Sequence, residues 1–517
     1  MGLKKITSYL ESCRWCNFKE DIKQRRVFDV SLEMLFYDKG KKLFVVGEAE
    51  LKDGSMRYFA MPMAHQQDKP QSPDVKYLMI DGEIYTDALL EKDFWQSFMA
   101  LVHEKNGIIK FPNGWKLIYR GIEDGANTIG EADKETSVPL GVEQSNTTLN
   151  IGEGKLAFKL ERMLDFSYEP NLELEMNEKL MRENSSVMPK TFGYFIWQMP
   201  DGRTANSGFV QEFVKNKGDM WNYLLCGLED HLRLSYLKQT AIRQEDYPEF
   251  LELFRALSKR TEEMEACFKK EDDNPRFCPE KVDDKFIHHY EKQFQVLCYQ
   301  AYRNIKNNLD RLPLDTYPQA KKLLASFDEM TSNFIQKRLE AIRLSADKGM
   351  IHRVHGDFHL GQVMVTPEND LKFIDFAGEP GLSVNERQQK RLSVRDVAGM
   401  YRSIKGYLGA VAAENFAEEG GNPESVKERR IWAKRAVKPL IDEATRIFLK
   451  DKNLKNNHWL ALEVLRKNLY EIDYELNNRP EMAYIPISGL TELLGADNGS
   501  IANDNLKKDK AAGYDLS

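Results

Sequence analysis

The first 95 residues alternate apolar and polar positions with a period of two. The alternation runs through residues 27–38, 42–51 and 56–64. A period of two places successive side chains on opposite faces of a β-strand. Asp-Lys-Gly at residues 38–40 and Lys-Asp-Gly at residues 52–54 separate the runs and are typical of tight turns. We therefore predict an antiparallel meander, followed by a helix over residues 88–103.

Residues 110–215 mix the strand period with the helix period. Two strands around a glycine-containing turn are predicted over residues 147–163, and a helix over residues 173–184. Residues 190–199 and 208–214 have the alternation of two further strands. This part of the chain is therefore expected to be mixed α and β.

Beyond residue 215 the apolar positions step by three or four, which predicts helices. The stripe is clearest over residues 286–309, and residues 321–343 repeat it. A short β hairpin over residues 363–376, with Pro-Glu-Asn-Asp at its turn, interrupts this helical region. A hairpin among helices is unusual, and the candidate chemistry of the chain lies around it.

Composition limits the classes of function. The chain has 517 residues, of which 42% are hydrophobic and 30% are charged, and its net charge is −7. An acidic chain without a long basic tract is a poor general binder of nucleic acid, because phosphate contacts need clustered Lys and Arg. No apolar run approaches the roughly 18 residues of a membrane span, and no signal-peptide core follows Met1. We expect a cytoplasmic protein with a small-molecule partner.

Cysteine usage agrees with a reducing compartment. Six cysteines in so long a chain do not resemble a disulfide framework. Cys13 and Cys16 form one Cys-x-x-Cys pair, but a structural zinc site needs a second pair of ligands at matching spacing. We expect both side chains to be packing residues.

The ordered set His355-Gly356-Asp357, Gln362 and Asp375 is the strongest chemical signal. Transfer of a phosphoryl group to a hydroxyl needs a carboxylate beside the hydroxyl and oxygen ligands for Mg²⁺. Asp357 precedes the hairpin, Gln362 begins its first strand, and Asp375 lies near the end of its second strand. Because a hairpin brings its ends together, the three side chains are expected to share one site. Any one of these short motifs alone would be common by chance.

This segment resembles the aminoglycoside phosphotransferase-like kinases, and within them the maltokinases. Further similar segments occur in order along the chain, at residues 10–19, 142–164, 169–175, 209–221, 395–403 and 470–487. The resemblance implies an α+β, bilobal, protein-kinase-like fold with a mostly helical C-terminal lobe. It implies an N-terminal cap over residues 1–95, a small lobe over residues 96–215 and a helical lobe over residues 216–517.

The resemblance also implies roles for individual residues. Asp357 would be the catalytic base, and Gln362 and Asp375 would hold Mg²⁺. Lys159 would contact the phosphates of ATP, oriented by Glu173 or, since the register is open, by Glu175. The remaining nucleotide contacts would come from a phosphate loop and from a hinge that faces adenine, namely Ser145, Asn146 and Thr147, and Gln211, Glu212 and Val214. Asp396 would anchor the catalytic loop, and His355 would brace it.

The sequence departs from the wider pattern at two places. No Gly-x-Gly-x-x-Gly loop is present, and Ala377 stands where maltokinases have an acidic residue. In the absence of that glycine-rich loop, we expect hydroxyl and amide side chains and backbone N–H groups to bind the phosphates. The second affects the surroundings of the metal site and not the class of reaction.

The candidate acceptor site lies on a helix predicted over residues 459–479. Tyr470, Glu471, Tyr474 and Asn477 lie on or beside its more polar stripe. Tyrosine faces can pack against a pyranose ring, and carboxylates and amides can bond to its hydroxyls. The alternative interpretation is that Tyr470 and Tyr474 are half-buried packing residues.

The predicted reaction is phosphorylation of maltose by ATP to give maltose 1-phosphate. The resemblance places this reaction in trehalose and α-glucan metabolism (glycogen biosynthesis), with a trehalose synthase as a partner enzyme. A second hypothesis is a kinase for another acceptor, such as glucosamine or an aminoglycoside. A third is a catalytically idle nucleotide-binding scaffold attached to a trehalose synthase.

Overall fold

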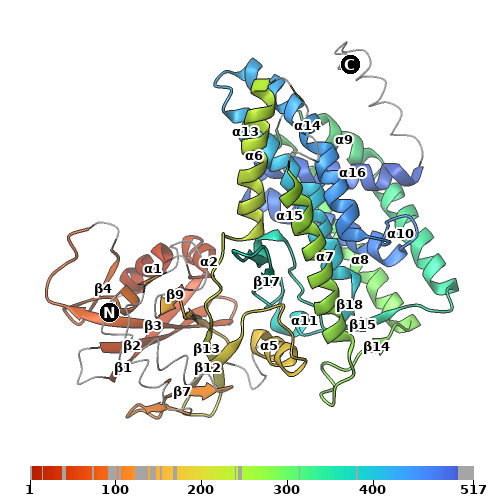
Figure 1. The fold of residues 1–517 in the computed structure, drawn as a ribbon. Helices are drawn as coiled ribbons and strands as arrows, with labels where there is room; N and C mark the ends of the chain where they lie inside the picture. The colour runs from red at the N-terminus through yellow and green to blue at the C-terminus, as the bar shows by residue number, and fades with distance from the viewer. Residues whose placement is uncertain are drawn as a thin grey trace. The chain divides into compact units, whose positions relative to one another are not determined.

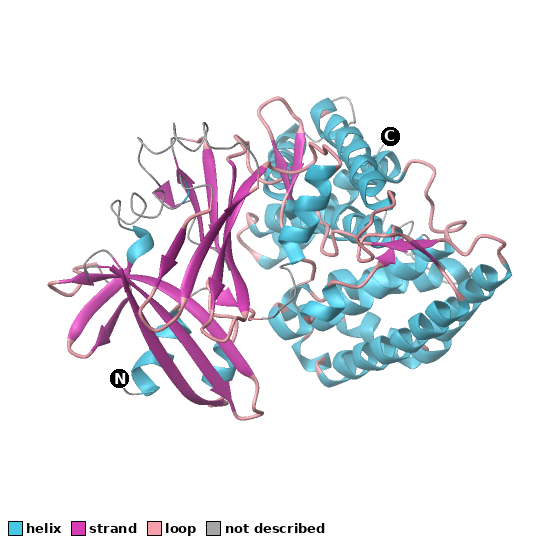
Figure 2. Ribbon diagram, turned by 90° about the horizontal axis from the view of Figure 1, so that it is seen from below, coloured by secondary structure: helices cyan, strands magenta, loops and turns pink. Residues whose placement is uncertain are grey.

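The computed structural model describes most of the chain. The described residues are 3–13, 15–37, 42–72, 75–90, 102, 106–122, 138–139, 147–151, 154–166, 172–238, 240, 242, 247–313, 315–379 and 382–498. The chain forms two compact units, one of residues 1–177 and 188–215 and the other of residues 178–187 and 216–517. Strands gather in the first unit and helices in the second (Figures 1 and 2), which confirms a kinase-like α+β fold.

The first sheet of unit 1 is an antiparallel meander, as predicted. Its strands are β1 (Val27–Tyr37), β2 (Lys42–Leu51), β3 (Met56–Gln66), β4 (Tyr77–Ile80) and β5 (Glu83–Asp87), in the order β1-β2-β3-β5-β4. The short strand β11 (Met163–Leu164) also pairs with β3. Helices α1 (Leu3–Ser12) and α2 (Lys19–Lys23) precede this sheet.

Both faces of this sheet are buried, because its alternation carries apolar residues on each side. Leu43 and Val45 of β2 belong to a core that also contains apolar residues of α1. Phe44 and Val46, one position along, belong to a different core shared with the second sheet. The predicted packing role of Cys13 and Cys16 is confirmed. Both thiols are free and buried in the core beside α1, and burial raises the pKa of each to about 11.

The second sheet of unit 1 carries the candidate nucleotide residues. Its strands are β6 (Ile108–Lys110), β7 (Lys116–Gly121), β8 (Val138–Pro139), β9 (Thr147–Ile151), β10 (Leu156–Leu160), β12 (Thr191–Gln198) and β13 (Thr204–Glu212), in the order β6-β7-β12-β13-β10-β9-β8. The strand predicted over residues 208–214 starts earlier and ends at Glu212, so Val214 lies beyond it. Gly208 has φ +150, and a Cβ there would lie 2.2 Å from the carbonyl oxygen of Lys159. Only glycine therefore fits at this position, where β13 pairs closely with β10.

Helix α5 (Leu172–Arg182) follows β10 and β11 along the chain, close to the range predicted from sequence. Of the helix predicted over residues 88–103, the structure describes a 3₁₀ turn at Ala88–Leu90. Nearly all the rest of that range lies outside the described residues.

Unit 2 consists mainly of helices. They are α6 (Met220–Lys238), α7 (Pro248–Lys269), α8 (Asp284–Asn307), α9 (Tyr317–Ala325), α10 (Phe327–Leu344), α11 (Val384–Arg387), α12 (Val394–Tyr401), α13 (Gly409–Glu418), α14 (Pro423–Leu449), α15 (His458–Asn478) and α16 (Tyr484–Asn498). A π-helical segment, Arg402–Leu408, joins α12 to α13. Helix α15 contacts α8, α10, α12 and α16, and its apolar stripe lies in their common core.

The helical pattern predicted over residues 321–343 is confirmed, but it is divided between two helices. Two helices, α9 and α10, cover this range and meet at Ser326, whose backbone has φ −129 and ψ 15. The apolar spacing continues across the break, since Leu323 and Phe327 enter the same core. Periodicity alone therefore did not locate it.

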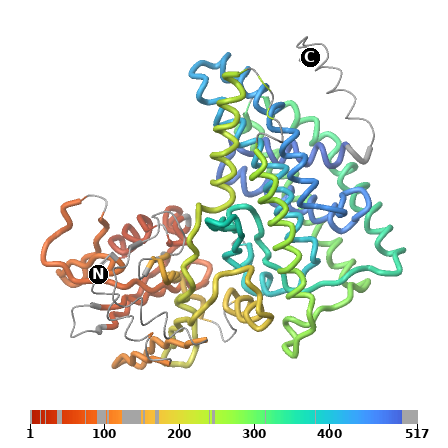
Figure 3. Tube along the Cα trace, in the orientation of Figure 1, coloured from red at the N-terminus to blue at the C-terminus, as the bar shows by residue number. Residues whose placement is uncertain are grey.

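The predicted hairpin is confirmed. Strands β16 (Val363–Val365) and β17 (Leu371–Phe373) pair antiparallel, with Val363 opposite Phe373. Strand β15 (Met350–His352) precedes the hairpin along the chain and pairs with β14 (Glu280–Lys281) and β18 (Arg391–Leu392). Along the chain this segment follows α10 and precedes α12, and Figure 3 draws its trace in teal. Across the described ranges, no helix has the length and apolar character needed to cross a bilayer.

The packing of unit 1 predicts a large penalty for removing Trp197. Its ring is fully buried and lies 5.0 Å from that of Phe44 and 5.9 Å from that of Phe111, centroid to centroid. Trp197→Ala should destabilise unit 1 by about 3–5 kcal/mol, because truncating a buried aromatic ring leaves a cavity. Hydrogen exchange of the β12 amides measures this. Phe28→Ala, at a side chain 64% exposed, is the control and should change stability by no more than about 0.5 kcal/mol. Equal protection in the two variants would contradict the packing described here.

Candidate functional site

The hairpin brings Gln362 and Asp375 together through its backbone. The N–H of Ile374 donates to the carbonyl of Gln362 at 3.0 Å, one step beyond the last strand pair. Asp375 follows directly, with φ +62, a left-handed conformation that non-glycine residues seldom adopt. The backbone pairing therefore places the two residues at the same end of the hairpin.

Asp396, in the first turn of α12, fixes the loop that carries Asp357. Its two carboxylate oxygens accept hydrogen bonds from the backbone N–H groups of His355 at 2.8 Å and Gly356 at 2.9 Å. Burial raises the pKa of Asp396 to about 7, although both hydrogen bonds act to lower it. The anchoring role expected from the sequence is confirmed.

His355 braces the same loop from the side of the hairpin. Its ring is 1% exposed, and Nε2 lies 2.9 Å from the carbonyl oxygen of Ile374. Burial lowers the pKa of His355 to about 4, so the ring is neutral near pH 7. A neutral ring that faces a carbonyl carries its proton on Nε2. His355 thus ties the loop of Asp357 to the residue before Asp375.

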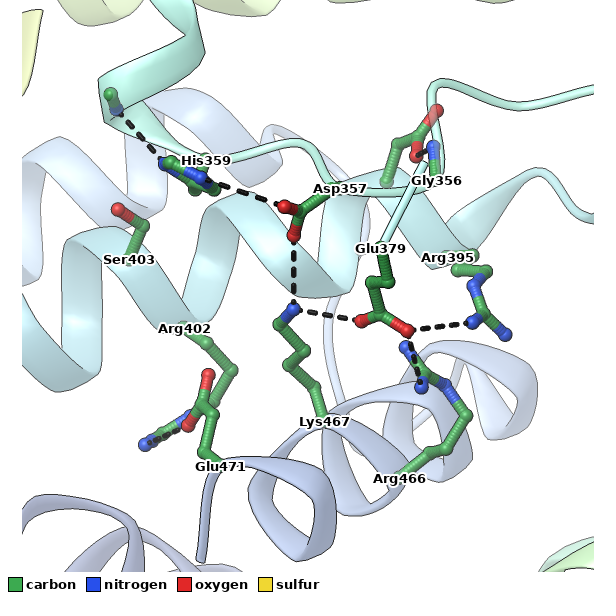
Figure 4. Close-up of polar contacts among 12 residues, drawn as sticks. Gly356, Asp357, His359, Glu379, Arg395, Arg402, Ser403, Arg466, Lys467 and Glu471 are labelled. Atoms are coloured by element: carbon green, nitrogen blue, oxygen red, sulfur yellow. Dashed lines mark hydrogen bonds and ion pairs between the residues drawn. The ribbon is translucent and has the colours of Figure 1, made fainter. Parts of the chain in front are cut away.

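Asp357 lies between a lysine and a histidine (Figure 4). Lys467 Nζ, from α15, is 3.4 Å from Asp357 Oδ1, and His359 Nε2 is 3.9 Å from Oδ2. The side chain of Asp357 is 19% exposed. The ammonium group of Lys467 fixes one oxygen, and His359 lies near the other.

The same lysine joins Asp357 to a buried charge cluster that sequence reasoning missed. Lys467 Nζ is 2.9 Å from Glu379, whose carboxylate is 1% exposed and also lies near Arg395 (3.2 Å) and Arg466 (3.6 Å). Burial acts to raise the pKa of Glu379, but the three cations outweigh it and hold this pKa far below its usual range. The signal that could have found the cluster is Arg466-Lys467, a basic pair at the edge of a buried helical stripe.

The four candidate acceptor residues do not all converge. Tyr470 and Tyr474 stack with their ring centroids 6.4 Å apart, and Lys467 Nζ lies 4.8 Å from the Tyr470 ring centroid. Glu471 is engaged by Arg402, with Nε at 2.9 Å. Asn477 donates to Asp473 on its own helix. A chain of side-chain contacts therefore connects Asp357 through Lys467 to Tyr470 and Tyr474.

In unit 1, Lys159 pairs with Glu173. Lys159 Nζ is 3.0 Å from the carboxylate of Glu173, which is 4% exposed. Glu175 is also buried, at 6% exposed. Of the two carboxylates left open by the sequence, Glu173 is thus the one that makes the ion pair.

The other nucleotide candidates lie on or near β9 and β13. Thr147 opens β9 opposite Leu160, whereas Ser145 and Asn146 lie outside the described residues. Gln211 donates from Nε2 to Thr191 at 3.0 Å. The backbone N–H of Glu212 donates to the carbonyl of Lys190 at 2.8 Å, so the sheet already uses that donor.

The chemistry of Gln362 and Asp375 fits Mg²⁺. Mg²⁺ prefers oxygen ligands and is usually bound by one or two carboxylates together with phosphates and waters. An amide oxygen and a carboxylate on adjoining strand ends supply such a pair. No cluster of three or more His, Cys, Asp or Glu is found in the part of the chain that the structure describes.

Comparison with solved structures identifies the fold. A glucosamine kinase in complex with glucosamine, ADP and inorganic phosphate superposes with a TM-score of 0.55 at 16% identity, over 90% of this chain and 94% of that one. Two other crystal forms of glucosamine kinase give TM-scores of 0.53 and 0.54. The chain shares its fold with these structures.

Comparison of sequences covers a smaller part of the chain. A glucosamine kinase of Streptacidiphilus jiangxiensis is 29% identical over 143 residues, which is 27% of this chain and 31% of that protein. The alignment thus spans about a third of the relative's length. No protein-family profile matches the chain. The maltokinase resemblance stays a prediction.

The burial of His355 predicts a pH-dependent contribution to stability. Its pKa falls from 6.5 to about 4 on folding, so the folded state binds fewer protons. This contribution is present above pH 6.5 and is lost as the pH falls towards 4. His355→Phe keeps a ring and removes the titration. The stability advantage of wild type over this variant should shrink by about 2 kcal/mol between pH 7 and pH 5.

Urea unfolding at the two pH values, followed by circular dichroism of the helices, measures this difference. Asp396 titrates in both proteins and so cancels in the comparison. A difference that does not change with pH would mean that His355 is not held neutral in the folded state.

Proposed function

We propose that this chain is an ATP-dependent sugar kinase. The observation that carries the proposal is the placement of Asp357. Lys467 holds this carboxylate at one end of a hairpin whose backbone also brings Gln362 and Asp375 together. A proton acceptor beside two oxygen ligands is the combination that phosphoryl transfer to a hydroxyl needs. An idle scaffold would need none of these groups in this arrangement.

In unit 2, Asp357 would orient the acceptor hydroxyl and take its proton as the oxygen attacks the γ-phosphate of ATP. Lys467 keeps the carboxylate in place through its contact with Oδ1. Gln362 and Asp375 would hold Mg²⁺, which neutralises the negative charge of the phosphates when bound. Positioning and electrostatics are the main contributions a protein makes to this reaction.

In unit 1, the proposal assigns the nucleotide contacts. Lys159, oriented by Glu173, would contact the phosphates, as lysines in kinase folds do. Ser145, Asn146 and Thr147 would complete the phosphate loop. Adenine would face the segment of Gln211, Glu212 and Val214, where carbonyl groups are the more promising contacts because the Glu212 N–H is used within the sheet.

We propose glucosamine as the first acceptor to test. Its support is the activity of the relatives, since both the aligned sequence and the superposed structures are of glucosamine kinases. The face of Tyr470, beside Lys467 and close to Asp357, could pack against the C–H face of one pyranose ring.

Maltose is the second candidate, and one observation favours it. The rings of Tyr470 and Tyr474 are stacked with an interplanar angle of 24°, so a second sugar ring would have a second aromatic side chain to pack against. On this alternative the product would be maltose 1-phosphate, and the chain would belong to trehalose and α-glucan metabolism, with a trehalose synthase as a partner.

A panel of acceptors tests the proposal. The chain is incubated with ATP, Mg²⁺ and glucosamine, glucose, maltose or an aminoglycoside, and products are assigned by ³¹P NMR. Glucosamine should give a new phosphomonoester signal and sugar-dependent release of ADP. Phosphorylation of maltose alone would select the second candidate. If no sugar increases ADP release above the rate with ATP alone, the proposed function is wrong.

A further inference from the structure

Unit 2 contains a cavity of about 660 Å³ whose lining includes none of Asp357, Gln362 or Asp375. Its walls are α10, the π-helical segment, α14, the start of α15 and α16. Cavities of this volume are typical of small-molecule sites. The proposed reaction leaves it without a role.

The charged side chains in the lining of this cavity are mostly basic. Among the described residues, seven lysine and arginine side chains line it against two carboxylates, Asp442 and Glu492. Lys405 and Lys438 both pair with Asp442, and Arg402 pairs with Glu471, a carboxylate outside the lining. Such an excess of positive charge, in a chain whose net charge is −7, favours an anionic ligand. Lysine ammonium groups around an open site suit a phosphate group.

Buried polar groups add hydrogen-bonding capacity at the cavity wall. Asn468 is 1% exposed, and its Nδ2 donates to the carbonyl of Val464 at 2.9 Å. Its Oδ1, like the hydroxyl of Tyr484, is buried and bonds to no other described residue. A buried acceptor without a partner is costly and calls for a ligand or water donor. Sugar hydroxyls are donors of this kind.

Arg402 lies at the wall where the cavity meets α15. Its side chain is 4% exposed, and a Cβ at Gly406 or Gly489 would lie 2.8 Å or 2.4 Å from its guanidinium. The two glycines therefore make the room that the guanidinium occupies. Arg402 also holds Glu471, one helical turn after Lys467.

The π-helical segment contacts the catalytic loop as well. Ser403, next to Arg402, accepts a hydrogen bond from the backbone N–H of Leu360 at 3.2 Å. Two neighbouring residues of this segment thus face the cavity wall and the loop of Asp357. π-Helical turns often mark functional positions in helices.

We propose that this cavity binds a phosphorylated sugar, and that its occupancy is linked to the acceptor site through Arg402 and Glu471. The lysines would hold the phosphate, and Asn468 and Tyr484 would bond to sugar hydroxyls. A ligand that contacts Arg402 would change the ion pair between Arg402 and Glu471. Glu471 lies on the same helix as Lys467 and Tyr470. The binding part stands on the cavity alone, whereas the linkage rests on the proposed function.

Calorimetric titration of the full chain with glucose 6-phosphate tests the binding part. Lys434→Glu with Lys455→Glu reverses two exposed charges at the cavity. This double variant should weaken binding by about tenfold or more, because both reversed charges repel the phosphate. Lys427→Glu, an exposed position on α14 outside the cavity lining, makes a similar change elsewhere and should leave the affinity unchanged.

The outcomes separate the parts of the proposal. Absence of glucose 6-phosphate binding to wild type would overturn the proposal. Equal binding to wild type and to the double variant would also overturn it, because the probe would then bind elsewhere, such as at the product end of the catalytic site. Inorganic phosphate that binds as tightly as the probe would overturn the sugar part.

The linkage has its own test, since coupling between two sites is reciprocal. Saturating glucosamine should shift the affinity for glucose 6-phosphate in wild type. An unchanged affinity, with glucosamine binding demonstrated, would overturn the linkage and leave the cavity as a site. If the chain phosphorylates no sugar, the binding titration still decides the first part.

Discussion

The candidate active site depends on how one ammonium group is held. Lys467 reaches Asp357 on one side and Glu379 on the other, while Arg395 and Arg466 hold the far side of Glu379. Unpaired, a carboxylate as buried as Glu379 would be expensive, so the cations and this carboxylate must be placed together. The arrangement leaves Asp357 with a fixed neighbour and a partly exposed side chain.

Helix α15 connects this site to the rest of unit 2. Its apolar stripe fills the common core with α8, α10, α12 and α16, while the next stripe carries Lys467, Tyr470 and Tyr474. Further round, Glu471 pairs with Arg402. One helix thus carries the lysine that contacts Asp357, the two stacked tyrosines and the carboxylate held by Arg402.

Local patterns predicted the hairpin, the meander and the approach of Gln362 to Asp375, because turn residues and alternation determine such short-range pairing. The break between α9 and α10 was not predicted, since Leu323 and Phe327 keep the helical spacing across it. The pairing of Glu379 with Lys467, 88 residues apart, was missed because charged residues usually lie on surfaces and long-range partners leave no local pattern. The π-helical segment likewise has no spacing that separates it from an α-helix. The choice of Glu173 over Glu175 needed coordinates, as both lie in the same helical turn.

The most direct test of the account is the rate of phosphoryl transfer by Asp357→Asn, measured in a single turnover beside its affinity for ADP. Glu368→Gln, an exposed position at the tip of the same hairpin, is the matched control. The account predicts that ADP binds both variants as it binds wild type, that the control keeps its rate, and that Asp357→Asn loses about 10²-fold or more, the lower range for general base catalysis. Full activity in Asp357→Asn would contradict it.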